Sequence, residues 1–204
     1  MTESAWDWEE QLEESASDLT RNDRLGTALI LLLVAGLVLA GLVIRQRTTT
    51  ATWLYSSREE GLEVAYPAGW LIDEQGDYVM RARDPKARPF NTRYQITAVP
   101  AGGQASIRNV LDGLTLQRST DLSAYRVLSV QESSLDGQTV TEMNFAYVDA
   151  DPNPFIQRLP TVVVGRDIVI RDGDRALVAT YMADRDTFDA GLSGFERFVA
   201  SLSY

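Results

Sequence analysis

An apolar block from Leu25 to Ile44 constrains this chain more than any other feature. It reads LGTALILLLVAGLVLAGLVI, contains no charged residue, and has Thr27 as its only polar side chain. As an α-helix rising about 1.5 Å per residue, the block spans roughly 30 Å, the thickness of the hydrocarbon core of a bilayer. Arg24 and Arg45 flank it, where their guanidinium groups can reach the lipid phosphates. We therefore predict a transmembrane helix over residues 25–45.

Two other interpretations of this block fit less well. A helix buried in a soluble protein would need a far larger core around it, because the block has no polar face. A cleaved signal peptide has a short basic leader and an apolar run of about 7–15 residues. Here the preceding segment is acidic, and no small-x-small cleavage site follows the run. The arginines near the two ends of the helix nearly balance, so the positive-inside rule leaves the orientation open.

The net charge of −10 is divided between the two ends of the chain. Residues 1–24 carry eight acidic residues and two arginines, and residues 48–204 carry 21 acidic and 15 basic residues. Binding to duplex nucleic acid requires Lys and Arg that neutralise phosphates, so this composition argues against a nucleic-acid partner. It also argues against contact with anionic lipid beyond the anchor itself.

Two groups of residues near the N-terminus are candidate partner contacts. Trp6 and Trp8 lie in the acidic tail of residues 1–24. This tail is either a solvated segment with a nascent helix, or a segment whose tryptophans dock on a partner or at the membrane interface. Within the apolar block, Gly36 and Ala40 form a small-xxx-small pair with Gly41 beside it, which lets another helix approach closely.

Beyond a polar tether at residues 46–52, residues 53–204 carry the patterns of a globular domain. Period-two alternation predicts strands, and Asp-Gly turns between them favour tight hairpins and hence an antiparallel sheet. Apolar residues at spacings of three and four predict helices over Ser106–Arg118 and Asp186–Leu202. The expected fold class is α+β, a mainly antiparallel sheet flanked by helices. The predicted strands are Leu62–Tyr66, Tyr78–Arg83, Tyr94–Val99, Tyr125–Glu132, Thr139–Tyr147, Thr161–Ile170 and Ala176–Met182.

A short motif marks the start of this domain. Trp53-Leu54-Tyr55 is followed by Gly61-Leu62-Glu63-Val64-Ala65-Tyr66-Pro67-Ala68-Gly69-Trp70, in which we expect Trp70 to cover the end of the sheet. This opening and the order of the later elements resemble the PsbP-like family over residues 53–204. The resemblance implies an α/β/α sandwich and an accessory or assembly role outside a bacterial membrane or in a thylakoid lumen. It favours an inner-membrane protein with a cytoplasmic N-terminus and an extracytoplasmic domain.

The chain departs from that family in its anchor and its acidic leader. The calcium- and chloride-retaining role of the photosystem II subunit is therefore assigned to no residue here. The run Asp149–Asn153 resembles the start of a calcium loop, but Pro154 and Pro160 replace the glycine and the bidentate glutamate that such a loop requires. We expect no metal site.

No catalytic constellation is visible in the sequence. The chain has neither cysteine nor histidine, which excludes Ser-His-Asp and Cys-His arrangements and the common zinc sites. No P-loop or dinucleotide fingerprint is present. We therefore expect no enzyme activity and no cofactor.

The proline-stiffened segment Asp149–Pro160 is a long connection within a compact domain, and such loops are often functional. Its Phe155 and Ile156 either pack on the core or dock on a partner protein.

These features predict a non-catalytic accessory subunit of a larger membrane complex, photosynthetic or respiratory. Its partners would be integral membrane subunits and membrane lipid. The alternative is a stand-alone membrane-anchored protein that holds a small ligand or lipid on the concave side of the sheet.

Overall fold

The computed structural model describes residues 21–49, 51–102, 107–135, 137–150 and 159–204. The chain divides into two units, Met1–Ala51 and Thr52–Tyr204. In the first unit, helix α2 (Arg21–Thr49) is 29 residues long and includes the whole apolar block. Its side chains are described for residues 26–41, and all of these are exposed. The large apolar ones are Leu29, Ile30, Leu31, Leu32, Leu33, Val34, Leu37, Val38 and Leu39.

Among the residues that the structure describes, no helix combines the length and apolarity of a membrane span. The helical conformation of residues 25–45 is confirmed, while their insertion in a membrane stays a prediction.

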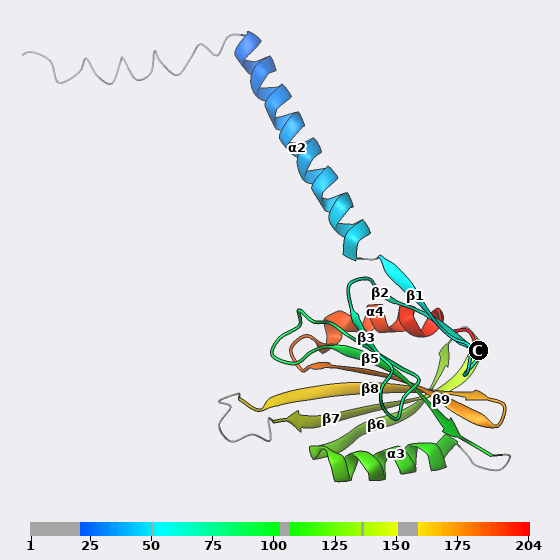
Figure 1. Ribbon diagram of the computed structural model, residues 1–204. Coiled ribbons are helices and arrows are strands. Elements are labelled where there is room, and N and C mark those ends of the chain that lie inside the picture. The colour runs from blue at the N-terminus through cyan, green and yellow to red at the C-terminus, as the bar shows by residue number, and fades with distance from the viewer. Residues whose placement is uncertain (1–20, 50, 103–106, 136, 151–158) are drawn as a thin grey trace, which may run out of the picture. The chain divides into compact units, whose positions relative to one another are not determined.

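The second unit is built on a seven-stranded sheet whose neighbouring strands are all antiparallel (Figure 1). The strand order is β3-β4-β5-β9-β8-β7-β6, and β1 and β2 form a separate antiparallel pair. The predicted α+β class is therefore confirmed. The strands are β1 (Thr52–Ser57), β2 (Leu62–Pro67), β3 (Leu71–Asp73), β4 (Met80–Arg83), β5 (Arg93–Pro100), β6 (Ser123–Leu135), β7 (Gln138–Asp149), β8 (Thr161–Asp172) and β9 (Arg175–Asp184).

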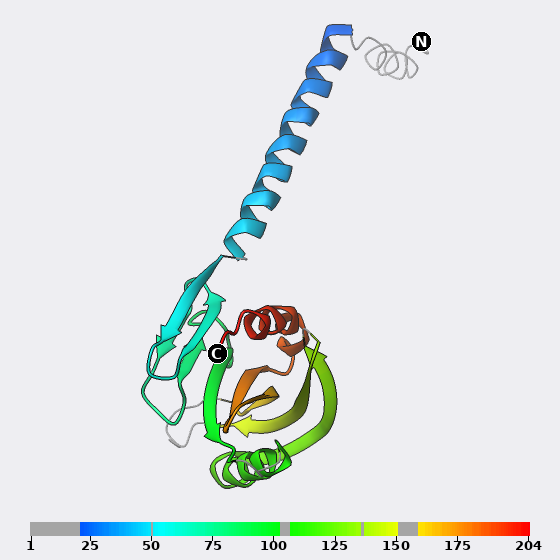
Figure 2. The same cartoon turned by 90° about the vertical axis from the view of Figure 1, so that its right-hand side faces the viewer.

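Helices α3 (Ile107–Asp121) and α4 (Phe188–Ala200) cover opposite faces of the sheet, which curls around α4 (Figure 2). Alternate residues of β9 show the division: Leu177 and Tyr181 pack in the core with α4, whereas Ala176 and Val178 pack with α3. The α4 side holds the larger core, which contains fully buried Phe195. The concave side of the sheet is thus filled by a helix, and the open cavities of the α3 side are the places to look for a ligand.

The motif at the start of the domain adopts the expected turn. Gly69 has φ of +84°, a conformation that glycine adopts without strain, and the Trp70 amide donates a hydrogen bond to the Pro67 carbonyl at 3.3 Å. The Trp70 ring lies 4.6 Å from the ring of Tyr94 and packs against the core below α4. The prediction that Trp70 is a packing residue is confirmed.

Candidate functional site

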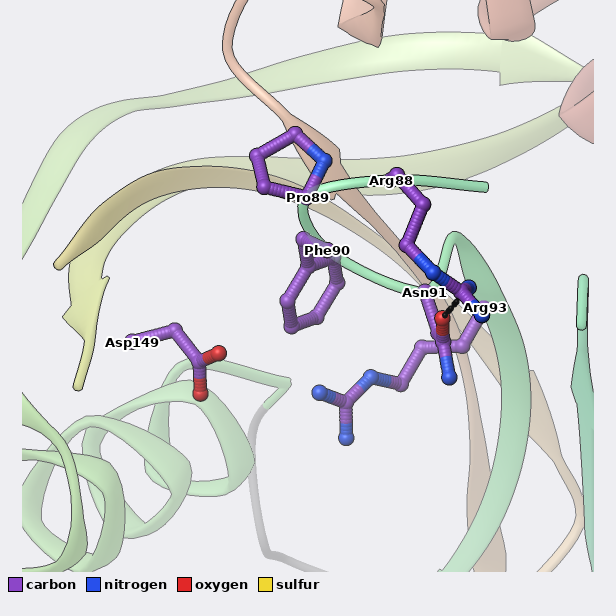
Figure 3. A pocket seen from close by; sticks show the side chains of 6 residues that line it. All are labelled: Arg88, Pro89, Phe90, Asn91, Arg93 and Asp149. Atoms are coloured by element: carbon purple, nitrogen blue, oxygen red, sulfur yellow. Dashed lines mark hydrogen bonds between the residues drawn. The ribbon is translucent and has the colours of Figure 1, made fainter. Parts of the chain in front are cut away.

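The α3 side of the domain contains a cavity of about 840 Å³ between α3 and strands β4 and β5. We call it the arginine groove and define it by Tyr78, Arg81, Arg93, Gln95 and Tyr147. A smaller cavity of about 470 Å³ adjoins it and shares Arg93 (Figure 3). Arg93 is therefore accessible from both cavities, which makes it the centre of the candidate site.

Strand alternation places several arginines on this face. Met80 and Ala82 of β4 face the α4 core, so Arg81 and Arg83 between and after them face the other side. In the same way, Tyr94 of β5 is buried in the α4 core and Arg93 beside it is not. The register pairs Arg83 directly with Arg93. Like charges directly opposite each other destabilise a sheet, so this arrangement needs a reason other than folding.

Arg93 is half-buried, and its guanidinium carbon lies 4.4 Å from the centroid of the Phe90 ring. Among the described residues, no carboxylate forms an ion pair with it and no acceptor takes a hydrogen bond from its guanidinium. Burial lowers the pKa of Arg93, and the charges of Arg81 and Arg83 act in the same direction, while Tyr147 and Asp149 act against them. Water is thus partly excluded from a charge that has no direct counter-ion in the part of the chain that the structure describes.

Arg81 is held in place by neutral neighbours. Its Nε donates a hydrogen bond to Gln95 Oε1 at 3.0 Å, and its guanidinium carbon lies 4.0 Å from the centroid of the Tyr78 ring. The Tyr78 hydroxyl donates to Asp73 Oδ2 at 2.6 Å, which fixes the ring. The terminal nitrogens of Arg81 have no partner within the described parts of the chain.

In the smaller cavity, Arg88 Nη1 donates a hydrogen bond to Asn91 Oδ1 at 2.9 Å (Figure 3). Figure 3 shows Asp149 on the opposite side of this cavity from Arg93, with Phe90 between them. Asp149 is half-buried, so water screens its repulsion of an anion less than that of the exposed Asp77 and Asp121, which line the larger groove. The larger groove is the better place for a negatively charged ligand.

Arg118 of α3 also lines the groove, but its charge is satisfied. Its guanidinium forms two hydrogen bonds with the fully buried carboxylate of Asp167, one of them at 3.0 Å, and Thr180 donates to the same carboxylate at 2.6 Å. Burial opposes the charge of Arg118, but the attraction of Asp167 outweighs it and raises the pKa of Arg118. This pair fastens α3 to the sheet.

A second surface of interest is the outer edge of β6. This strand is 13 residues long, and of the strands that the structure describes it pairs with β7 alone. It contains neither proline nor lysine, and it exposes Val127, Leu128 and Val130. The register shifts lie before Ser129, so the run Ser129–Leu135 is regular. An edge of this kind is open to a further strand.

Of the residues predicted as partner contacts, the structure describes those on α2. Gly36, Ala40 and Gly41 lie on α2, where Ala40 is exposed and an added Cβ at either glycine would meet open space. Trp6, Trp8, Phe155 and Ile156 lie outside the described residues, as does most of the calcium-like run. Within the described residues, no three acidic side chains lie close enough together to hold a metal ion.

Sequence reasoning missed the arginine groove. The signal was present in Met80-Arg81-Ala82-Arg83 and in Arg93-Tyr94-Gln95-Ile96, where arginine alternates with buried residues. The net negative charge of the domain gives no indication of a local basic site.

The described part of residues 52–204 is thus an antiparallel α+β domain with helices on both faces and an arginine-lined groove under one of them. Its fold is PsbP-like: it is similar to cyanobacterial PsbP (CyanoP) of Synechocystis, with a TM-score of 0.53 and 16% identity over 75% of this chain and 92% of that one. No protein-family model and no curated protein matches the chain.

Two further solved structures are similar. A protein of unknown function from Pseudomonas aeruginosa has a TM-score of 0.47 and 13% identity over 75% of this chain and 96% of that one. The Ran-binding protein Mog1p of Saccharomyces cerevisiae has a TM-score of 0.46 and 11% identity over 75% of this chain and 95% of that one. At these identities the likeness concerns the fold alone.

Proposed function

We propose that this chain is a non-catalytic accessory subunit of a larger membrane complex. Residues 25–45 anchor it, and the domain binds a partner subunit through the open edge of β6. The observation that carries the proposal is this edge, because natural proteins normally protect long edge strands with proline, lysine or a covering element. The opposite edge of the sheet, β3, is only three residues long and offers little for pairing.

Strand addition explains what the edge offers a partner. The outer backbone amides and carbonyls of a regular edge strand can pair with an extended segment, and alternate side chains then decide which segment fits. Val130 and Glu132 lie on the face that α3 covers, since they pair with Met143 and Thr141 of β7. An apolar and an acidic position two residues apart would favour a partner strand with an apolar and a basic residue at the same spacing.

The anchor is supported by the side chains of α2. Its exposed leucines and valines would all contact water in a soluble protein, whereas lipid would cover them. The open space around Gly36 and Gly41 supports packing against a partner's helix, since small residues allow two helix backbones to approach closely. We propose the inner membrane of a cell as the location, with a cytoplasmic N-terminus.

The anchor is tested by membrane extraction. The chain is expected to stay in the pellet after alkaline carbonate treatment, and the double variant Leu33→Arg/Val38→Arg to be released, because each central arginine costs about 2.5–3.5 kcal/mol of insertion free energy. Gln46→Arg in the tether is the control and should stay in the pellet. Single cysteines at Ser4 or Ser203 of this cysteine-free chain report orientation: on intact cells an impermeant thiol reagent should label only Ser203→Cys. Labelling of Ser4→Cys alone would reverse the assigned orientation.

The docking role is tested by native purification in mild detergent and mass spectrometry of the co-migrating proteins. We expect an assembly of fixed stoichiometry, and we expect Val130→Lys to lower the recovered partner at least about fivefold while the melting temperature is unchanged. A lysine at this position would lie beside the apolar residue of the added strand, and its charge would disfavour the pairing of the two strands. Leu116→Lys is the control, because Leu116 is an exposed apolar residue, 71% against 53% for Val130, that lies on α3 and not on the edge strand.

Two results would count against this function. If Leu116→Lys and Val130→Lys reduce the partner equally, β6 is not the docking edge. If the wild-type chain runs alone, the accessory role fails, and the alternative of a stand-alone binding protein for a small ligand or lipid takes its place.

A further inference from the structure

We infer that the arginine groove binds a small organic oxyanion, a phosphate or carboxylate with an apolar body, whose charged group is held by Arg93 and Arg81. This inference does not depend on the accessory role, since the groove lies between α3 and strands β4 and β5, whereas the docking edge is the outer side of β6.

The first argument compares the arginines of this domain with one another. Five of them are half-buried within the described residues, and three have a carboxylate partner. Arg118 pairs with Asp167, Arg166 with Glu142, and Arg175 with both Glu60 and Asp172. The other two are Arg81 and Arg93, and both line the groove. Within the described residues, the other half-buried arginines therefore have counter-charges, and the two in the groove have none.

The second argument concerns the cost of this arrangement. A charge that is removed from water without a partner is unfavourable, and burial does lower the pKa of Arg93. Arg83 opposite Arg93 in the sheet adds repulsion. Such local conflicts between a side chain and its surroundings are expected at functional sites. An oxyanion bound to both guanidinium groups would relieve the conflict.

The third argument concerns recognition. A guanidinium presents its N–H donors as a planar fork that matches the oxygens of a phosphate or carboxylate. Arg81 is pre-oriented by Gln95 and Tyr78, and Arg93 by stacking on Phe90, so little side-chain entropy remains to be lost on binding. Tyr147 also lines the groove, and its hydroxyl, which donates a long hydrogen bond to Met182 Sδ at 4.0 Å, is a further donor for the anion if it rotates away from that sulfur.

The fourth argument concerns the rest of the ligand. The groove volume of about 840 Å³ is that of a small-molecule site. Val99, Leu114 and Met182 line it beside the arginines and offer an apolar wall. Two carboxylates, Asp77 and Asp121, also line it, but both are exposed and remain hydrated, so their repulsion of the anion is screened. The site favours an anion with an apolar body over a bare inorganic ion.

The test is calorimetric titration of the full chain, in a neutral detergent and at low salt, with phenyl phosphate. Benzyl alcohol serves as the neutral analogue and glycerol phosphate as the soluble mimic of a phospholipid headgroup. We expect phenyl phosphate to bind, benzyl alcohol to bind at least about tenfold more weakly, and Arg93→Gln to weaken phenyl phosphate at least about tenfold, since it removes a charge-assisted hydrogen-bonded pair. Arg58→Gln, at an exposed arginine outside the groove, should stay within about twofold of wild type.

Further variants and measurements distinguish the loss of the binding site from misfolding of the domain. Arg93→Gln is expected to keep or raise the melting temperature, because it removes a half-buried charge that no described carboxylate pairs with. Arg81→Gln should weaken phenyl phosphate by at least about fivefold, and Arg93→Lys, which keeps the charge but loses the fork, should give intermediate affinity. Glycerol phosphate should bind more weakly than phenyl phosphate; equal or tighter binding would overturn the apolar-bodied ligand. Absence of phenyl phosphate binding, or equal affinity in the groove variants and Arg58→Gln, would overturn the site.

Discussion

Replacing Asp167 with alanine is expected to destabilise the domain by about 3–5 kcal/mol, the usual effect of removing one partner of a buried ion pair. Asp167 is fully buried and accepts hydrogen bonds from both Arg118 and Thr180. Without it, the Arg118 guanidinium keeps a hydrogen bond to Thr180 Oγ1 at 3.4 Å and the Phe145 ring, whose centroid lies 4.4 Å from the guanidinium carbon, but neither group carries a negative charge. The contact between α3 and the sheet then holds an uncompensated charge.

The measurement is thermal unfolding of the full chain in detergent, followed by near-ultraviolet circular dichroism. At about 2–4 °C per kcal/mol for a domain of this size, Asp167→Ala should lower the melting temperature by roughly 10 °C. Glu60→Ala is the matched control, because Glu60 also pairs with an arginine, Arg175, but is more than a third exposed. Such pairs contribute about 0–1 kcal/mol.

A double replacement separates the charge from the packing. Arg118→Met combined with Asp167→Leu removes both charges together and should recover most of the stability that Asp167→Ala loses, because no unpaired ion remains. If Asp167→Ala and Glu60→Ala shift the melting temperature alike, the ion pair does not fasten α3 to the sheet.

Phe195→Ala is the second substitution with a large expected effect, a loss of about 3–5 kcal/mol in the free energy of unfolding. Phe195 is fully buried at the centre of an aromatic cluster, with ring centroids 5.5 Å from both Tyr94 and Tyr181 and 6.1 Å from Phe198. Its removal leaves a cavity between α4 and the sheet. Leu116→Ala is the control, because Leu116 is 71% exposed on α3 and should change stability by less than about 0.5 kcal/mol.

The same variant has a spectroscopic readout that reports the α4 core directly. Burial raises the pKa of Tyr181 from its ordinary value to about 12, with a smaller contribution from Asp189, and the Tyr181 hydroxyl donates to the Phe188 carbonyl at 2.9 Å. A cavity beside the ring admits water, so Phe195→Ala should lower this pKa towards 10. Absorbance at alkaline pH measures it. A small loss of stability together with an unchanged tyrosine titration would show that α4 does not cover this face.

The sign of the pH effect follows from this shift. The folded protein keeps the Tyr181 proton at pH values where the unfolded chain has already lost it. The contribution of this tyrosine to stability is therefore complete below about pH 10, and it is lost as the pH rises through the folded value of about 12. The loss should be smaller in Tyr181→Phe, which has no proton to release.

The elements that were predicted correctly have strong local signals. The stripe of Phe188, Phe195 and Phe198 predicted α4, and the Asp-Gly turn at Gly173, with φ of +57°, predicted the hairpin between β8 and β9. Strands β1 and β3 were not among the predicted strands. β1 has consecutive apolar residues without alternation, and Trp53 and Leu54 are exposed on it. β3 is too short for any period to be read.

The candidate sites also differ in whether a local sequence pattern could predict them. The candidate contacts on α2 follow from residue spacing along one helix, so sequence alone was enough to propose them. The arginine groove was identified from arginines that have no carboxylate partner among the described residues. Whether an arginine has such a partner depends on a second residue, which can be far away in the sequence. Arg118 and Asp167 are 49 positions apart, and Arg175 and Glu60 are 115 apart. No local pattern could separate these satisfied arginines from Arg81 and Arg93.

By itself, the sequence determined the apolar helix, the antiparallel α+β class, the main hairpins and the packing role of Trp70, because each follows from the period of apolar residues or from the conformational needs of glycine and proline. Only the tertiary structure decided that α4 fills the concave side of the sheet and that, among the described residues, β6 is an edge strand and Arg93 lies half-buried without a counter-ion. The reason is physical: burial and charge pairing depend on distances between residues far apart in the chain, and these distances exist only once the strands have paired.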